Sequence, residues 1–230
     1  MRRIVNDENN IITRLEEIGI SKVFAEDNKA YVMGQISRVN GISYGKNEKF
    51  QEIRVEVPRT SGKSDFVLIR VPCYLISKDV SLDRGQWIEA AGEYRSFVRN
   101  GRKKMFVYVK WIFFHDEKPT LEGDYNLVYI NGYICNEPLY KRVYSGFSEL
   151  SAFCVAVQRK YSTPNKEADY IHCIAWGDDV SVIRQLDIGQ KIGFYGRIQS
   201  RVFYKHSSNE NISMPTEVNE VSIIQIKKIE

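Results

Sequence analysis

The side chains best suited to chemistry lie in one stretch, residues 169–179, which reads DYIHCIAWGDD. Small and medium apolar groups take every second position: Ile171, Cys173 and Ala175. Between them stand two aromatic rings with polar atoms, a histidine and an isoleucine: Tyr170, Trp176, His172 and Ile174. A period of two predicts a strand with one face toward a core and the other outward. An outward row of aromatic rings is typical of a surface on which flat groups stack.

The end of this stretch predicts a change of structure. Gly177 stops the strand, and Asp178 and Asp179 supply acidic residues for the first turn of a short helix over residues 180–186. Helix capping therefore explains these two acids without a catalytic role. No pairing of a nucleophile with a base is visible along the chain, and we expect no enzyme activity.

Five segments within residues 125–226 resemble, in order, the strands of bacterial single-stranded DNA-binding proteins of the OB-fold type. The segments are residues 126–132, 156–161, 169–179, 187–201 and 217–224. The resemblance implies a five-stranded barrel that binds single-stranded DNA through a groove on one face.

An internal repeat predicts a second barrel before this one. Residues 31–36 are similar to residues 129–134, and three further pairs share one constant offset. Those pairs are 64–67 with 168–171, 83–86 with 187–190, and 92–96 with 196–200. The predicted fold is all-β, with two tandem five-stranded OB-fold barrels and short helices.

The remaining segments connect or extend these barrels. We expect an N-terminal helical extension at residues 1–28, a first OB-fold at 29–115, a linker at 116–124 and a second OB-fold at 125–230. Apolar residues at helical spacing over residues 10–19, followed by Gly19, predict a helix that either caps the first barrel or docks a partner. The dipeptide Asn100-Gly101 predicts a tight hairpin, because this pair favours the type I′ turn.

Stacking positions follow from the resemblance. In the second barrel they are all aromatic: Tyr161, Tyr170, Trp176 and Phe203. The corresponding positions of the first barrel are Ser61, Phe66, Pro72 and Arg99, so only Phe66 is aromatic, although Phe97 lies near the last of them. Core packing is the alternative role for any one of these rings.

Positive charge is concentrated in the barrel that has lost its stacking positions. Residues 29–115 carry 16 Lys and Arg against 8 Asp and Glu, whereas residues 116–230 carry 13 against 15. Basic side chains beside the expected groove would contact phosphates: Arg59, Arg95, Arg99, Arg102, Lys103, Lys104, Arg159, Lys160, Arg197 and Arg201. For the cluster around residues 99–104, a solvated charged hairpin is the alternative.

Other functional classes find little support. The four cysteines, Cys73, Cys135, Cys154 and Cys173, form no CxxC pair, which favours small buried side chains in a reducing cytoplasm over disulfides or metal. The three histidines, His115, His172 and His206, show no ligand spacing, so we expect no metal or other cofactor. Without an apolar membrane span or a secretory signal, a cytoplasmic, nucleoid-associated location is expected.

Two functional hypotheses remain. The first is sequence-tolerant binding of single-stranded DNA in replication, recombination or repair. The alternative is an OB-fold interaction module similar to primosomal replication protein N, which would dock a helicase or primase and bind nucleic acid weakly. The chain ends at Glu230 without the acidic tail by which the family recruits replication proteins, which keeps the alternative open.

Assembly follows from the number of barrels. Members of the family with one barrel form tetramers, so a chain with two barrels would reach four as a homodimer. The first strands pair between subunits in the family, and here they are residues 31–36 and 127–134. If these two strands instead pair within one chain, a monomer would result.

Overall fold

The computed structural model describes residues 27–45, 48–99, 101–119, 125–143, 148–159, 167–207 and 210–229. The helix expected at residues 10–19 lies outside this part of the chain. Eleven strands dominate the described residues: β1 (Asn28–Tyr44), β2 (Lys49–Pro58), β3 (Ser64–Pro72), β4 (Trp87–Arg99), β5 (Arg102–His115), β6 (Asn126–Ile134), β7 (Leu139–Val143), β8 (Ser148–Gln158), β9 (Ala168–Trp176), β10 (Lys191–Ser207) and β11 (Glu210–Ile229). A 3₁₀ turn, η2 (Cys73–Leu75), follows β3, and a short helix, α2 (Asp179–Ile183), follows β9.

The strands close into two barrels with the same cyclic order. In the first barrel, β1 pairs with β2, β2 with β3, β3 with β5, β5 with β4, and β4 again with β1. In the second barrel, β6, β8, β9, β11 and β10 follow the same cycle, and β7 adds to the edge at β8. In each barrel only the third and fifth strands, β3–β5 and β9–β11, run parallel. The prediction of two tandem five-stranded barrels is confirmed.

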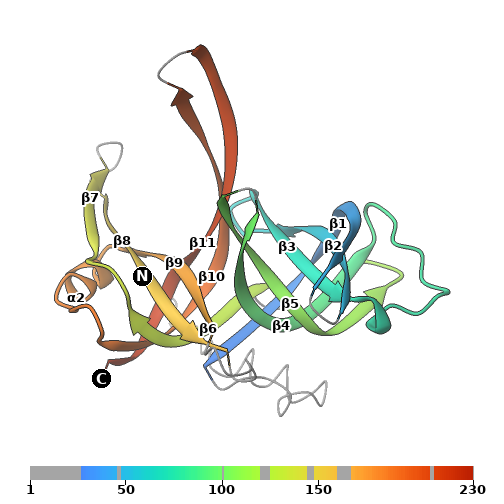
Figure 1. Cartoon of the computed structure of the whole chain (residues 1–230), viewed down its shortest axis with the longest axis horizontal. Helices are drawn as coiled ribbons and strands as arrows, with labels where there is room; N and C mark the ends of the chain where they lie inside the picture. Colours follow the sequence, from blue (N-terminus) through green and yellow to red (C-terminus); the bar gives the residue numbers. More distant parts are fainter. Residues whose placement is uncertain are drawn as a thin grey trace.

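The first strands of the two barrels join them into one sheet. β1 and β6 pair antiparallel, from Asn28 opposite Ile130 to Val32 opposite Asn126 (Figure 1). This pairing lies within one chain, which is the arrangement that the sequence left as the alternative to pairing between subunits. The continuous sheet holds the barrels side by side.

Alternating side chains fill both barrels. In the first barrel Ile53 and Val55 of β2 point inward with Val67 and Ile69 of β3, and all four are buried. Burial of each such side chain stabilises the fold by roughly 1.5–3 kcal/mol. The same period of two sets the interior of the second barrel, as the sequence predicted for β9.

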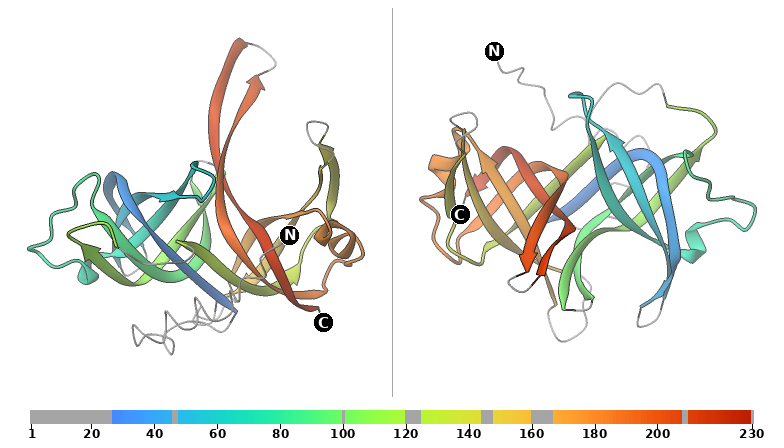
Figure 2. Two further views of the ribbon diagram at one scale, coloured as in Figure 1. Left: turned by 180° about the vertical axis from the view of Figure 1, so that it is seen from behind. Right: turned by 90° about the horizontal axis from the view of Figure 1, so that it is seen from above.

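The two hairpins that follow the fourth strands differ in length. The β4–β5 hairpin closes with Arg99 opposite Arg102, and Gly101 has a φ of +70°, as the Asn-Gly pair predicts for a tight turn. The β10–β11 hairpin is much longer, because its pairing continues to Ser207 opposite Glu210. It projects beyond both barrels in Figure 1 and in the left view of Figure 2.

Helix α2 ends earlier than the sequence predicted. The prediction covered residues 180–186, but the helix spans Asp179–Ile183. After it, the amides of Gln185 and Leu186 bond to Val182 and Ile183 three residues back, which tightens the chain into 3₁₀ geometry. Among the described residues, no helix is long and apolar enough to cross a membrane.

Close backbone approach explains two glycines of the repeat. A Cβ on Gly34 of β1 would clash with the carbonyl of Glu56 on β2, and one on Gly132 of β6 would lie 2.5 Å from the carbonyl oxygen of Ala156 on β8. These are the two places where a first strand closes its barrel. Gly34→Ala should therefore lower the free energy of unfolding by about 2 kcal/mol, measured by urea denaturation.

Gly41→Ala is the matched control in the same strand. A Cβ there meets no atom within 4 Å. This variant should change the free energy of unfolding by less than about 0.5 kcal/mol. Equal effects of the two substitutions would contradict the role of Gly34 in barrel closure.

Candidate nucleic-acid interface

Strand β9 presents the outward aromatic row that its sequence predicts. Ile171, Cys173 and Ala175 are buried in the barrel, whereas Tyr170 is 45% and Trp176 36% exposed. His172 is exposed between them. The one exception is Ile174, which lies on the outer side but is buried. The structure thus places Tyr170 and Trp176 where rings can stack on a ligand.

The other predicted stacking residues of the second barrel cannot be placed in the same way. Tyr161 and Lys160 lie outside the described residues. The backbone of Phe203 lies on the projecting hairpin opposite Thr216, and its side chain is outside the description.

The β4–β5 hairpin of the first barrel lies against the aromatic row of the second. Lys103 Nζ is 5.1 Å from the centroid of the Tyr170 ring, within the range of a cation–π interaction. Partial desolvation of its otherwise exposed ring, and next the charge of Lys103, lower the pKa of His172. Lys104 is exposed on the same hairpin, and the backbone of Arg102 lies there too. Basic residues of one barrel are thus brought to the outward aromatic row of the other.

A reciprocal contact joins the β10–β11 hairpin to the first barrel at Phe66. Asn219 Nδ2 donates to the carbonyl of Phe66 at 2.7 Å, and the amide of Phe66 donates to Ser200 Oγ at 2.9 Å. The guanidinium of Arg54 lies 3.7 Å from the Phe66 ring centroid and binds both carboxylate oxygens of Glu217 at 3.0 and 2.9 Å. Unlike Tyr170, Phe66 already carries a planar cation on its ring.

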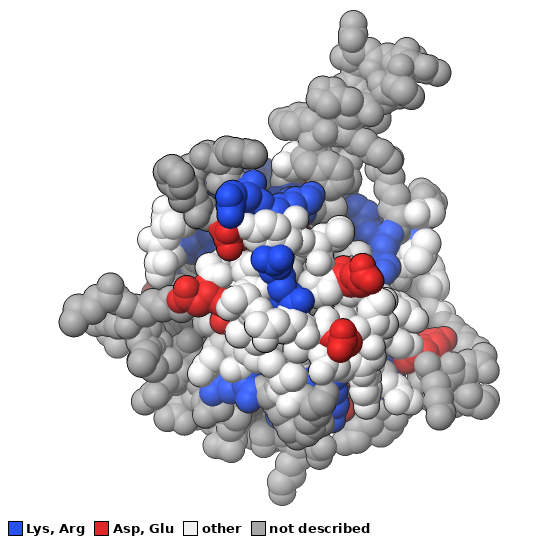
Figure 3. All heavy atoms as spheres, turned by 90° about the vertical axis from the view of Figure 1, so that its left-hand side faces the viewer, with Lys and Arg blue, Asp and Glu red and all other residues white. Residues whose placement is uncertain are grey.

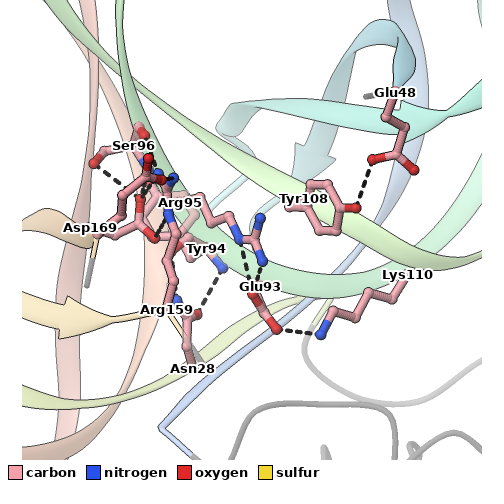
Figure 4. A network of polar contacts seen from close by, with 11 residues as sticks. Asn28, Glu48, Glu93, Tyr94, Arg95, Ser96, Tyr108, Lys110, Arg159 and Asp169 are labelled. Carbon is pink, nitrogen blue, oxygen red and sulfur yellow. Dashed lines mark hydrogen bonds and ion pairs between the residues drawn. The ribbon is translucent and has the colours of Figure 1, made fainter. Parts of the chain in front are cut away.

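Two buried carboxylates fix the junction between the barrels, and Figure 4 shows one of them, Asp169, with its partners. Asp169 is 1% exposed. It accepts bonds from Arg159 Nε and Nη2 at 2.8 and 2.7 Å and from the amide of Ser96, in the first barrel, at 2.7 Å. Arg159 Nη2 also donates to the carbonyl of Ser96 at 3.0 Å. The hydrogen bond to Asp169 raises the pKa of the Arg159 guanidinium.

Asp65 of the first barrel makes the equivalent contacts in the opposite direction. It is also 1% exposed, binds Arg59 through both carboxylate oxygens, and accepts the amide of Ser200, in the second barrel, at 2.8 Å. Arg59 and Arg159, both predicted as phosphate ligands, are therefore engaged by carboxylates at the junction.

A groove of about 400 Å³ opens on the first barrel next to this junction. Arg70 lies 3.6 Å from the ring centroid of Phe97 and 4.7 Å from that of Phe106, and Arg95 lies 4.1 Å from that of Tyr108. Planar cations over aromatic rings form a surface that suits bases and phosphates together. The lining residues are Gly45, Glu48, Phe50, Arg70, Arg95, Ser96, Phe97, Phe106, Tyr108, Arg159 and Glu167.

The sequence predicted Arg95, Phe97 and Arg159 of this groove as binding residues, but Arg70, Phe106 and Tyr108 were missed. Phe106 and Tyr108 stand at alternate positions of β5, so its period of two was a usable signal. The role of Arg70 depends on its place opposite Glu52 in the β2–β3 pair, which no local pattern reveals.

Carboxylates neutralise several of the predicted basic residues. Burial alone would raise the pKa of Glu93, but ion pairs with Arg95 and Lys110 lower it. Glu52 lies 2.8 Å from Arg70 and 3.2 Å from Arg99.

In the second barrel Arg201 Nε lies 3.0 Å from Glu220, whose pKa burial raises in spite of this contact. On the face seen in Figure 3, basic and acidic side chains are interspersed on a largely uncharged surface.

Arg197 lines a hollow that includes neither Tyr170 nor Trp176. This smaller hollow of about 220 Å³ lies at the junction, and its other lining residues are Pro58, Arg59, Thr60, Asp65, Lys118, Tyr125 and Asn126. Within the described part of the chain, no group of three or more His, Cys, Asp or Glu side chains could hold a metal ion.

Asp169→Asn tests the junction. Arg159 and the Ser96 amide both donate to this carboxylate, so the amide nitrogen of asparagine would face donors, and Arg159 would lose its counter-charge. Because Arg159 is partly exposed, we expect a loss of about 2–4 kcal/mol in the free energy of unfolding, measured by urea denaturation. Asp65→Asn should behave alike, whereas Asp116→Asn, at an exposed acid of the linker, should be neutral. Near-zero effects at both buried positions would contradict the proposed junction.

Comparison with known proteins agrees with this architecture. Residues 125–224 match the model of the single-strand binding protein family. No curated protein matches the chain.

Solved structures cover both barrels. The wild-type single-stranded DNA-binding protein from Thermus aquaticus superposes with a TM-score of 0.62 at 14% identity, over 87% of this chain and 92% of that chain. A deletion mutant of the same protein gives 0.63 at 12% identity, over 87% and 93%. The N-terminal domain of the PriB protein from Thermoanaerobacter tencongensis gives 0.35 at 25% identity, over 39% and 98%. At these identities the Thermus likeness establishes a shared fold. The resemblance predicted from the sequence is therefore confirmed: the second barrel matches the single-strand binding protein family, within a chain built from two OB-fold barrels.

Proposed function

We propose that the protein binds single-stranded DNA without strong sequence preference, in the cytoplasm and in the service of replication, recombination or repair. One observation carries the proposal: the barrel that matches the single-strand binding protein family holds Tyr170 and Trp176 outward on β9. Aromatic faces accept any base, because every base has a π-face, so such a surface is sequence-tolerant. This role is binding, without catalysis.

We infer a division of labour between the barrels. Bases stack on Tyr170 and Trp176, while the β4–β5 hairpin with Lys103 and Lys104 supplies positive charge beside them. The contact of Lys103 with the Tyr170 ring supports this arrangement. A strand crossing this surface would therefore meet rings from one barrel and cations from the other.

We propose that the groove with Arg70, Phe97 and Tyr108 extends the DNA-binding surface over the first barrel. Its guanidinium groups lie over rings, so a base or a phosphate would meet a cation before it meets the ring. Arg59 and Arg159 are assigned to positioning: they hold the junction on which the groove and the aromatic row depend.

Trp176→Ala tests the stacking surface. Loss of one stacked ring should weaken binding of oligo(dT) by about 1–3 kcal/mol, measured by fluorescence anisotropy of a labelled oligonucleotide at fixed salt. The ring is partly exposed, so circular dichroism should show an intact fold.

Phe113→Ala is the control, since Phe113 is 51% exposed on β5 and stacks on Trp111. Its affinity for oligo(dT) should equal that of the unaltered protein. A folded Trp176 variant with unchanged affinity would contradict a stacking role, and an unfolded variant would assign the ring to the core.

Replacement of Arg102, Lys103 and Lys104 by alanine tests the hairpin. Each phosphate contact contributes roughly 0.7 to the slope of log affinity against log salt, so the slope should become shallower by about 1–2. Oligo(dT) titrations at several salt concentrations measure it.

The control removes the same charge elsewhere on the first barrel, through Lys63, Lys78 and Arg84, which are all exposed. This variant should keep the slope. Weaker binding with an unchanged slope in the hairpin variant would show that the hairpin contacts no phosphate.

We infer that two chains assemble to bring four barrels together. The pairing of β1 with β6 within the chain removes the strand contact expected for this dimer. The remaining support is the four-barrel unit of the one-barrel family members, and the dimer must then use another surface. Light scattering at micromolar concentration should give about twice the chain mass of 26.7 kDa. A mass near 26.7 kDa with oligo(dT) binding intact would contradict the dimer.

A further inference from the structure

Two cysteines lie opposite each other where β6 pairs with β8 and closes the second barrel. The β6–β8 register places Tyr133 opposite Ala156 and Ile134 opposite Val155. The next position along this register brings Cys135 opposite Cys154. The amide of Cys135 donates to the carbonyl of Cys154 at 3.0 Å, and the Cys135 thiol lies 3.2 Å from the same oxygen.

The surroundings of the pair set its reactivity. Cys154 is 8% exposed and lies on the outer side of β8, opposite His172 of β9. Cys135 is half-buried and therefore the more accessible thiol. Burial, followed by a hydrogen bond with Cys135, raises the pKa of Cys154 to about 12.

The remaining cysteines are differently placed. Cys173 points into the barrel core and is 1% exposed. Cys73 lies in η2 of the other barrel. Only Cys135 and Cys154, among the four, face each other across a strand pair.

We propose that Cys135 and Cys154 are an oxidative modification site, where an intramolecular disulfide staples β6 to β8. Residues opposite each other in an antiparallel pair have Cα atoms about 4.5–5.5 Å apart. A disulfide requires about 4.4–6.8 Å between Cα atoms, so the bond needs little backbone movement. The inference is independent of DNA binding.

The oxidant is a low-molecular-weight disulfide such as oxidised glutathione. The thiolate of Cys135 attacks one sulfur, forms a mixed disulfide and releases one reduced glutathione. The thiolate of Cys154 then attacks the Cys135 sulfur and releases the second. The two protein thiols lose two electrons and two protons, and the oxidant is reduced to two thiols. Because Cys154 holds its proton tightly, the second step is slow at neutral pH and accelerates as the pH rises.

The staple has a structural consequence. It encloses residues 135–154, including β7, in a covalent loop, and it reinforces the β6–β8 pairing that completes the barrel. The cross-link should raise the free energy of unfolding, because it restricts the unfolded chain.

The test uses the full chain incubated with oxidised glutathione at pH 8.5, then alkylated under denaturing conditions without reductant and mapped by peptide mass spectrometry. We expect the count of free thiols to fall from four to two and a Cys135–Cys154 cross-linked peptide to appear. The melting temperature should rise by roughly 5–10 °C and return on reduction.

Substitution variants identify the thiols involved. Cys135→Ser and Cys154→Ser should each abolish the cross-link, while Cys73→Ser should keep it. A thiol count that stays at four, a stable glutathione adduct on Cys135 alone, or a link to Cys173 would overturn the proposal. A cross-link without a rise in melting temperature would overturn the claim that the disulfide stabilises the barrel.

Discussion

The structure depends on two buried carboxylates, Asp65 and Asp169, that each serve both barrels. Each binds an arginine of its own barrel and accepts a backbone amide of the other, so one hydrogen bond to a buried carboxylate crosses the junction in each direction. A buried carboxylate without its partners would be strongly unfavourable. Because each carboxylate also accepts an amide of the other barrel, its full set of hydrogen bonds forms only when the barrels keep this relative position.

That position has a functional consequence. The β1–β6 pairing makes the two barrels one sheet, and the carboxylates hold the β4–β5 hairpin of the first barrel beside the aromatic row of the second. Basic side chains and outward aromatic rings, which the sequence separates into two halves, are brought together in space. At the β10–β11 hairpin, Glu217 binds Arg54, and Arg54 lies over the Phe66 ring. The two hairpin contacts therefore have similar backbone arrangements, but different side chains meet at each.

Much of this fold follows from local patterns. The period of two in residues 169–179 predicted which side chains of β9 point inward, and the repeat predicted a second barrel with the same strand order. Asn100-Gly101 predicted the tight hairpin. These features are set by neighbours along the chain, so they are visible without the fold.

The roles of particular side chains were harder to predict, because they depend on contacts between distant segments. Arg59 and Arg159 were expected at phosphates, but carboxylates and backbone groups at the junction engage them. Cys135 and Cys154 were expected as small buried side chains, and only the β6–β8 register reveals that they face each other. Ile174 was expected outward, but the structure buries it.

Amide hydrogen exchange tests the junction most directly, at the two amides that the carboxylates accept across the barrels. The amides of Ser96 and Ser200 should exchange only through global unfolding, with protection equal to that of a core amide such as Ile69. If the barrels moved independently, both amides would exchange quickly while Ile69 stayed protected. That result would contradict a fixed junction between the barrels.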